Sequence, residues 1–168
     1  LHQICSYEAQ AAMALEGLAA AALHDPRRAA QLHRYAIPLR TDAALAYWDW
    51  QPLLEAVLRD RSDPSIEPAA IALAVHQALA QAIVDLTIVW PEPCRSTGLL
   101  LAGGCFQNAV LLDLCVTQLR EQGIKPYWPQ RLPCNDAALA AGQLLAAPTL
   151  PINSAAPWAA HHVPRRTG

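Results

Sequence analysis

The clearest pattern of apolar and polar positions in this chain is a short apolar run that ends in two glycines. Residues 99–102 are apolar and run into Gly103 and Gly104, and apolar residues at helical spacing follow over 111–122. Such a run, stopped by Gly-Gly and followed by a 3.6-residue period, predicts a buried strand, a tight loop and a helix. The loop then lies at the carboxyl end of its strand, where open α/β sheets bind ligands and a helix N-terminus offers free N–H groups to phosphate. Glycine serves a plain strand-to-helix turn equally well, and by itself the Gly-Gly pair favours the plain turn over a phosphate site.

A second strand and helix follow in the same order. Residues 124–128 predict a strand, 129–135 a loop and 136–146 a last helix. Two strands joined by one helix predict parallel pairing with a right-handed crossover. We therefore expect the Gly103–Gly104 loop and Asp136 to lie at the same edge of the sheet, although Asp136 is also suited to capping its own helix.

The segments before this unit predict helices and a small hairpin. A first helix, capped by Ser6 with Glu8 in its first turn, is expected to end at Asp25-Pro26. A hairpin follows, with a turn at 40–42 and strands over 35–39 and 46–50.

Two further helices are predicted over 52–59 and 65–89, the longer one capped by Ser65. Its apolar stripe consists of Ile71, Val75, Leu79, Ile83 and Leu86. His76 lies beside the stripe, and a lone histidine in such a place is more often structural than a ligand. Polar residues interrupt the apolar segment, which argues against a membrane span. Residues 90–97 are expected to form a loop.

Composition narrows the class of protein. The chain has 168 residues, a net charge of −2 and many alanines, which indicates a globular, mostly helical domain with no electrostatic footprint for nucleic acid or membrane. Five cysteines without C-x-x-C spacing suggest reduced thiols and a cytoplasmic protein. Since the sequence opens on Leu1 without a signal-peptide pattern, we expect it to begin inside a longer polypeptide. Residues 1–147 are expected to form the folded part, and 148–168 a proline-rich, loosely ordered tail.

Three ordered stretches resemble the motifs of one family. Gly103-Gly-Cys-Phe-Gln-Asn108 is similar to S-G-G-V-F-Q-N, residues 132–143 to P-x-N-D-G-G-L-A-x-G-Q, and residues 6–16 to S-Y-E-G-Q-A-A-M-x-L-E. These are motifs of the hydrogenase-maturation carbamoyltransferases, the HypF family. The likeness covers roughly residues 5–146.

The resemblance implies a fold and an activity. This chain would be most of the second lobe of an α/β domain of the actin and sugar-kinase (ASKHA) type, helix-rich with a small parallel or mixed sheet, related to the tRNA threonylcarbamoyladenosine synthases. Family enzymes make carbamoyl-adenylate from carbamoyl phosphate and ATP in other domains. They transfer the carbamoyl group to the C-terminal cysteine of a partner protein, and dehydration of the product supplies cyanide ligands for nickel–iron hydrogenase.

The resemblance also implies site residues. Gly103 and Gly104 match nucleotide-contacting glycines, and Asn108 an asparagine that can bond ribose or phosphate. Glu16 matches a glutamate whose counterpart in the related tRNA-modifying enzymes contacts the nucleotide. Asp136 matches a ligand of a divalent metal, iron or zinc. The implied cofactors are therefore ATP or carbamoyl-adenylate and this metal, whereas no catalytic residue is assigned.

The sequence departs from the family motifs at several positions. Ala9 stands where the family has glycine, Ala137 and Ala138 replace Gly-Gly, and an alanine held at positive φ would be strained. The family's His-x-x-x-His metal motif does not occur in this sequence. Because one carboxylate cannot hold a catalytic metal, we expect the remaining ligands outside this chain, and we predict that the chain alone does not catalyse the transfer.

Three alternatives remain open. Cys105 follows Gly-Gly near a helix N-terminus, a plausible place for the nucleophile of a thiol amidase. The chain could instead belong to a tRNA threonylcarbamoyladenosine synthase-like protein, or be a non-catalytic remnant lobe. ATP binding separates the remnant from the enzymes.

Overall fold

The computed structural model describes residues 4–23, 35–42, 45–89 and 91–146. The first half contains helix α1, strands β1 and β2, and helices α3 and α4, which span Gln10–Leu23, Leu39–Asp42, Leu45–Trp48, Gln51–Arg61 and Pro68–Val89. The second half contains α5, β3, α6, β4 and α7, which span Pro91–Thr97, Leu99–Leu100, Ala109–Glu121, Pro126–Tyr127 and Leu139–Ala146. Two 3₁₀ turns precede α6 and α7, at Gly104–Gln107 and Asp136–Ala138.

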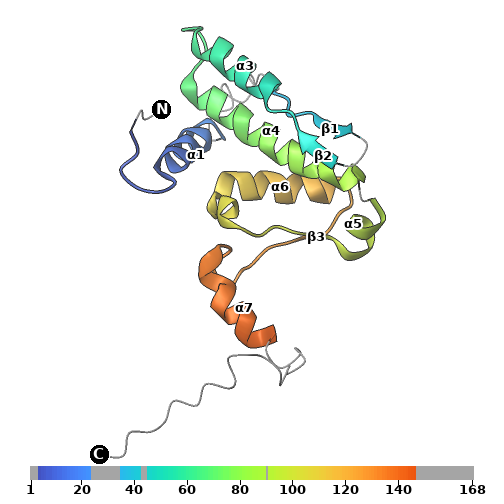
Figure 1. Cartoon of the computed structure of the whole chain (residues 1–168). Helices are drawn as coiled ribbons and strands as arrows, with labels where there is room; N and C mark the ends of the chain where they lie inside the picture. The colour runs from blue at the N-terminus through green and yellow to red at the C-terminus, as the bar shows by residue number, and fades with distance from the viewer. Residues whose placement is uncertain (1–3, 24–34, 43–44, 90, 147–168) are drawn as a thin grey trace, which may run out of the picture.

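Helix α4 lies at the centre, with α1, α3 and α6 packed around it (Figure 1). Most of its buried residues are alanines, which let the neighbouring helices approach closely on several sides. The predicted apolar stripe is consequently only half-buried. Helix α4 is long and apolar enough to cross a membrane, but 56% of its most apolar stretch is buried within this fold, as expected for a core helix.

Three apolar clusters form the core. One joins α4 and α6 to the strands β3 and β4, a second joins α1 to α4 and α6, and a third packs the hairpin and α3 against α4. In the third cluster the Tyr35 hydroxyl donates a 2.7 Å hydrogen bond to the buried Asp60 carboxylate. Burial and this carboxylate raise the pKa of Tyr35 above its ordinary value. Asp60 lies inside α3, which continues to Arg61, two residues beyond the predicted end at 59.

Strands β3 and β4 pair in parallel, as predicted, with α6 as the crossover helix. Leu99 is paired with Pro126 and Leu100 with Tyr127. The Leu99 N–H donates to the Lys125 carbonyl at 2.9 Å, and the Leu101 N–H donates to the Tyr127 carbonyl at 2.7 Å. The prediction of a fully buried strand was wrong, because Leu100 is 66% exposed while Leu101 is buried against α4 and α6.

The predicted start of the first helix was also wrong. Helix α1 begins at Gln10 instead of just after Ser6, because Ala9 has a φ of 63° and interrupts helical geometry. Ser6 does not cap the helix; its N–H donates to the Gln10 side-chain oxygen at 2.6 Å. Glu8 therefore precedes the helix. Asp25-Pro26, its predicted end, and the tail 148–168 lie outside the described residues.

Other boundaries differ from the sequence-based expectation for local reasons. The hairpin is confirmed as antiparallel, but the predicted turn residues 40–42 belong to β1. Helix α4 begins at Pro68, and the Ser65 hydroxyl donates to Asp63 instead of capping it. Residues 91–97 form α5 where a loop was expected. Proline is tolerated in the first turn of a helix, so Pro91 does not prevent this one.

Ala9→Gly is expected to raise the free energy of unfolding by about 1 kcal/mol. Left-handed backbone strains any residue with a Cβ, and glycine removes that strain, although its freer unfolded chain offsets part of the gain. Ala9 is the non-glycine residue with positive φ in the described part of the chain. Urea unfolding of the 168-residue chain measures the change.

Ala12→Gly provides the matched control. Ala12 is exposed and lies inside α1, where glycine should destabilise by about 1 kcal/mol. If both variants shift the urea midpoint in the same direction, Ala9 is not strained in solution.

Candidate functional site

The Gly103–Gly104 loop and the loop that leads to Asp136 lie side by side. The Gly103 N–H donates a 2.6 Å hydrogen bond to the carbonyl of Cys134, two residues before Asp136. This contact confirms that the two loops open at the same edge of the parallel pair, as the crossover rule predicted. Glycine and acid are therefore brought together at the carboxyl ends of β3 and β4.

The two glycines of the first loop differ in backbone conformation. Gly103 has a φ of 105°, a conformation that disfavours any side chain, whereas Gly104 is not among the positive-φ residues. A Cβ built on either glycine would meet no atom within 4 Å in the described structure. Gly103 is thus needed for the turn itself, and Gly104 keeps the space above the loop open.

The N-terminus of α6 is closed by side chains of this chain. The Glu16 carboxylate accepts a hydrogen bond from the Ala109 N–H at 2.7 Å, and Asn108 Oδ1 accepts from the Leu111 N–H at 2.9 Å. The expectation that this helix end offers free N–H groups to a phosphate was wrong for these two donors. A carboxylate already lies where the helix dipole attracts an anion. A 3₁₀ turn also separates the glycines from the helix.

Asn108 has a second partner that the motif did not reveal. Its side-chain nitrogen lies 2.8 Å from Nε2 of His76, which is 2% exposed in the middle of α4. His76 is thus a hydrogen-bonded core residue, as its position beside the apolar stripe suggested. A buried imidazole needs polar partners, and that was the available signal; nothing in the sequence identified Asn108 as one of them.

Asp136 is exposed and begins the 3₁₀ turn before α7. The side chain that caps this turn belongs to Asn135, which accepts from the Ala137 N–H at 3.2 Å, so the alternative that Asp136 is the cap was wrong. Neither Ala137 nor Ala138 has positive φ, so these replacements of glycine create no strain.

The residues present do not form a metal site by themselves. Across the residues that the structure describes, no group of three or more His, Cys, Asp or Glu side chains lies close enough to hold a metal ion. Asp136 can supply one oxygen ligand, and a complete set needs donors from elsewhere.

The cysteines give little support to a thiol enzyme. Cys105 is exposed beside the glycines, but His76, the histidine within the described ranges, has both ring nitrogens engaged with other groups. Among the described residues, no histidine with an unengaged ring nitrogen is therefore available as a base for the Cys105 thiol. Cys115 is fully buried in the core, and burial raises the pKa of its thiol to about 12.

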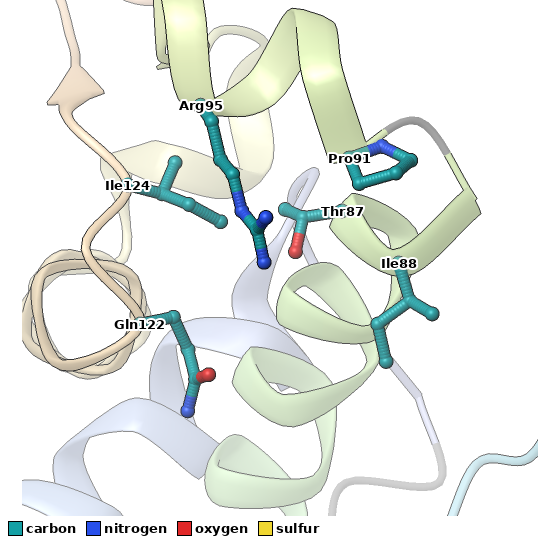
Figure 2. A pocket seen from close by; sticks show the side chains of 6 residues that line it. All are labelled: Thr87, Ile88, Pro91, Arg95, Gln122 and Ile124. Atoms are coloured by element: carbon teal, nitrogen blue, oxygen red, sulfur yellow. The ribbon is translucent and has the colours of Figure 1, made fainter.

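A hollow of about 300 Å³ lies at the opposite end of α6. Figure 2 shows the Arg95 side chain extending from α5 between Ile124 and Thr87, with Gln122 at the end of α6 below it. Helix α6 has 13 residues, so this hollow lies about 20 Å from the glycine loop and is no part of the candidate site.

The fold and the paired loops define an α/β lobe that presents a glycine turn and an acid at one sheet edge. The family model described as "Carbamoyltransferase, Kae1-like Domain, second subdomain" matches residues 1–143. The chain therefore belongs to the carbamoyltransferase HypF family, in the segment that forms the second subdomain of its Kae1-like domain.

The relatives are much longer than this chain. Carbamoyltransferase HypF of Synechocystis sp. is 35% identical over 142 residues, which cover 84% of this chain and 17% of that protein. A HypF homolog of Cupriavidus necator is 32% identical over 151 residues, covering 89% of this chain and 37% of that protein. A crystal structure of full-length HypF in the phosphate- and nucleotide-bound form has a TM-score of 0.74 at 24% identity, covering 92% of this chain and 19% of that one. This last likeness supports the ASKHA-type fold.

Proposed function

We propose that this chain is the nucleotide-facing lobe of a carbamoyltransferase that moves a carbamoyl group from carbamoyl-adenylate to the C-terminal cysteine thiol of a partner protein. The observation that carries the proposal is the hydrogen bond from Gly103 to Cys134, which holds the glycine loop beside Asp136 in a member of this family. A related full-length HypF is described as phosphate- and nucleotide-bound, which supports a nucleotide here.

In the proposed reaction the partner's thiolate attacks the carbamoyl carbon. The bond from that carbon to the phosphate oxygen breaks, AMP leaves, and the thiol proton passes to solvent. The role of this chain is to bind and orient the adenylate. Gly103 and Gly104 let its phosphate approach the backbone, because no side chain stands in the way. Water exclusion and the remaining contacts come from domains outside this chain.

Glu16 and Asn108 can bind a nucleotide only through side-chain atoms that are not already engaged in capping α6. Glu16 Oε1 and Asn108 Oδ1 already accept backbone N–H groups. The second carboxylate oxygen of Glu16 and the second amide hydrogen of Asn108 are suited to ribose hydroxyl groups. We therefore propose that both residues first hold the loop and then contact the nucleotide.

Asp136 is proposed as one ligand of a divalent metal, iron or zinc, whose other ligands lie outside this chain. A metal bound there would neutralise charge on the nucleotide phosphates. Because Asp136 is exposed at the loop edge, it is accessible to donors from another domain.

Asp136→Ala is expected to lower bound metal at least about tenfold, because a carboxylate ligand is lost. The test uses a chimera in which this chain replaces the matching segment of the Synechocystis relative, which supplies the other domains. Metal per protein is measured by mass spectrometry after dialysis, and transfer is measured as carbamoyl label on a peptide that ends in cysteine.

Asp113→Ala is the matched control, since Asp113 is an exposed aspartate on α6. It should change neither readout. If the Asp136→Ala chimera keeps its metal and transfers carbamoyl groups at the parental rate, Asp136 has no such role. If the parental chimera neither binds ATP nor transfers the label, the proposed function is wrong and a non-catalytic lobe remains.

A further inference from the structure

We infer that His76 is a positioning residue for the nucleotide loop: from the core of α4 it fixes the Asn108 amide, and through it the Gly103–Gly104 turn. This inference rests on the proposed function for its consequence, namely nucleotide affinity. Its structural part rests on a chain of hydrogen bonds that joins α4 to the beginning of α6.

The donors and acceptors in this chain of bonds can be assigned without ambiguity. Nδ1 of His76 lies 2.8 Å from the carbonyl oxygen of Ala72, which can only accept, so Nδ1 carries the proton. In the neutral ring Nε2 then has a lone pair, and it accepts from Asn108 Nδ2 at 2.8 Å. The Leu111 N–H independently fixes the other end of the Asn108 amide, because it donates to Oδ1 at 2.9 Å. His76 is thus held in one tautomer and Asn108 in one orientation.

Asn108 transmits this constraint to the glycine loop. It ends the 3₁₀ turn that starts at Gly104 and caps α6, and its own N–H donates to the Cys105 carbonyl at 3.2 Å. Phe106, inside the same turn, packs against the core cluster of α4 and α6. The bond from His76 therefore acts on the residue that ends the turn to which Gly104 belongs.

Glu16 adds an anchor from a third helix. Its carboxylate, on α1, accepts the Ala109 N–H at 2.7 Å, one residue beyond Asn108. Side chains from α1 and α4 thus meet at the start of α6, where the glycine loop ends. Of these anchors, the bond from His76 lies deepest, because His76 is 2% exposed whereas Glu16 is half-buried. Water can replace a lost partner of Glu16 more readily than one of His76.

Removing the acceptor at His76 should release the loop without removing any nucleotide contact. His76→Phe fills the space but leaves the Asn108 amide without its acceptor, so the cap on Leu111 should open more often. His76→Gln can place an amide oxygen near the position of Nε2 and should restore the bond. Thr87→Val is the matched control: Thr87 is buried on the same helix, its hydroxyl bonds the Val84 carbonyl at 2.6 Å, and it lies at the far end of α6.

Two measurements test the inference. In the 168-residue chain, hydrogen exchange of the Leu111 amide should become about tenfold faster in His76→Phe, and should stay near the parental rate in His76→Gln and Thr87→Val. In the chimera with the Synechocystis relative, calorimetry should show ATP affinity about tenfold weaker in His76→Phe, with the same recovery in His76→Gln.

Each of the other outcomes contradicts a specific part of the inference about His76. Unchanged exchange of the Leu111 amide in His76→Phe would show that His76 does not position Asn108. Equal effects of Thr87→Val and His76→Phe would show that His76 contributes only to stability. Faster exchange with unchanged ATP affinity overturns the link to the nucleotide loop. If the parental chimera fails to bind ATP, the proposed function fails, while the exchange experiment still decides whether His76 positions Asn108.

Discussion

Gly104→Arg is expected to abolish ATP binding in the chimera, weakening affinity at least about 100-fold, while the fold of this chain stays intact. Gly104 lies outside the positive-φ region, and a Cβ on it would meet no described atom within 4 Å, so the backbone tolerates a side chain. An arginine there would extend into the space that a phosphate needs to approach the loop. Calorimetric titration with ATP measures the loss, and urea unfolding checks the fold.

Gly17→Arg is the control for adding an arginine at an open glycine. Gly17 is exposed on α1, and a Cβ there also meets nothing within 4 Å. This variant should bind ATP like the parent chimera, and helix propensity should even favour it slightly. Parental ATP affinity in a folded Gly104→Arg chimera would rule out the glycine loop as the nucleotide site.

The features predictable from the sequence are those that depend on neighbouring residues or on a topological rule. The apolar run, the glycines and the helical period specified β3, the loop and α6, and the crossover rule then placed the loop with Asp136 beside Gly103. Gly123 follows α6 and its cap with a φ of 73°, the conformation that glycine commonly adopts just beyond a helix. The departure at Ala9 was expected to be strained if positive φ was needed, and its φ of 63° fits that expectation.

The features that were missed are contacts between residues far apart in the chain. Glu16 caps α6 across 93 positions, and His76 bonds Asn108 across 32. A helical period says which face of a helix is apolar, but not which side chain of another helix reaches its end. The assumption that the start of α6 is open to phosphate failed for this reason. Family resemblance pointed to Glu16 and Asn108, but their bonds to α6 required the fold.

Exposed leucines on β3 and α7 show a second limit of prediction from the sequence. Leu100 on β3 and Leu144 and Leu145 on α7 are each at least 66% exposed, and no residue of α7 is buried. Helix α7 stands apart from the other helices (Figure 1). An apolar run predicts burial, but it does not say that the covering surface belongs to the same segment. The Synechocystis relative extends far beyond the matched part, which is 17% of its length.

Gly98→Ala is expected to be the most destabilising substitution considered for this chain, lowering the free energy of unfolding by about 3 kcal/mol or more. Gly98 precedes β3 with a φ of 84°. A Cβ there would collide with the Lys125 carbonyl oxygen and lie 2.7 Å from Cε2 of Tyr127. Backbone strain and the clash with the carbonyl add, because the Lys125 carbonyl accepts the Leu99 N–H and cannot move without disturbing the β3–β4 pairing.

Gly123→Ala separates the contribution of backbone strain from that of the steric clash. Gly123 also has positive φ, 73°, but a Cβ there meets nothing within 4 Å in the described structure, so only the strain of about 1 kcal/mol should appear. Urea unfolding of both variants gives the difference, which measures how closely β4 must approach the residue before β3. Since the two loops of the candidate site continue from these strands, a large difference means that Gly98 also sets their separation. Equal losses in the two variants would mean that the strands can move apart freely, and that the contact between Gly103 and Cys134 does not depend on their close packing.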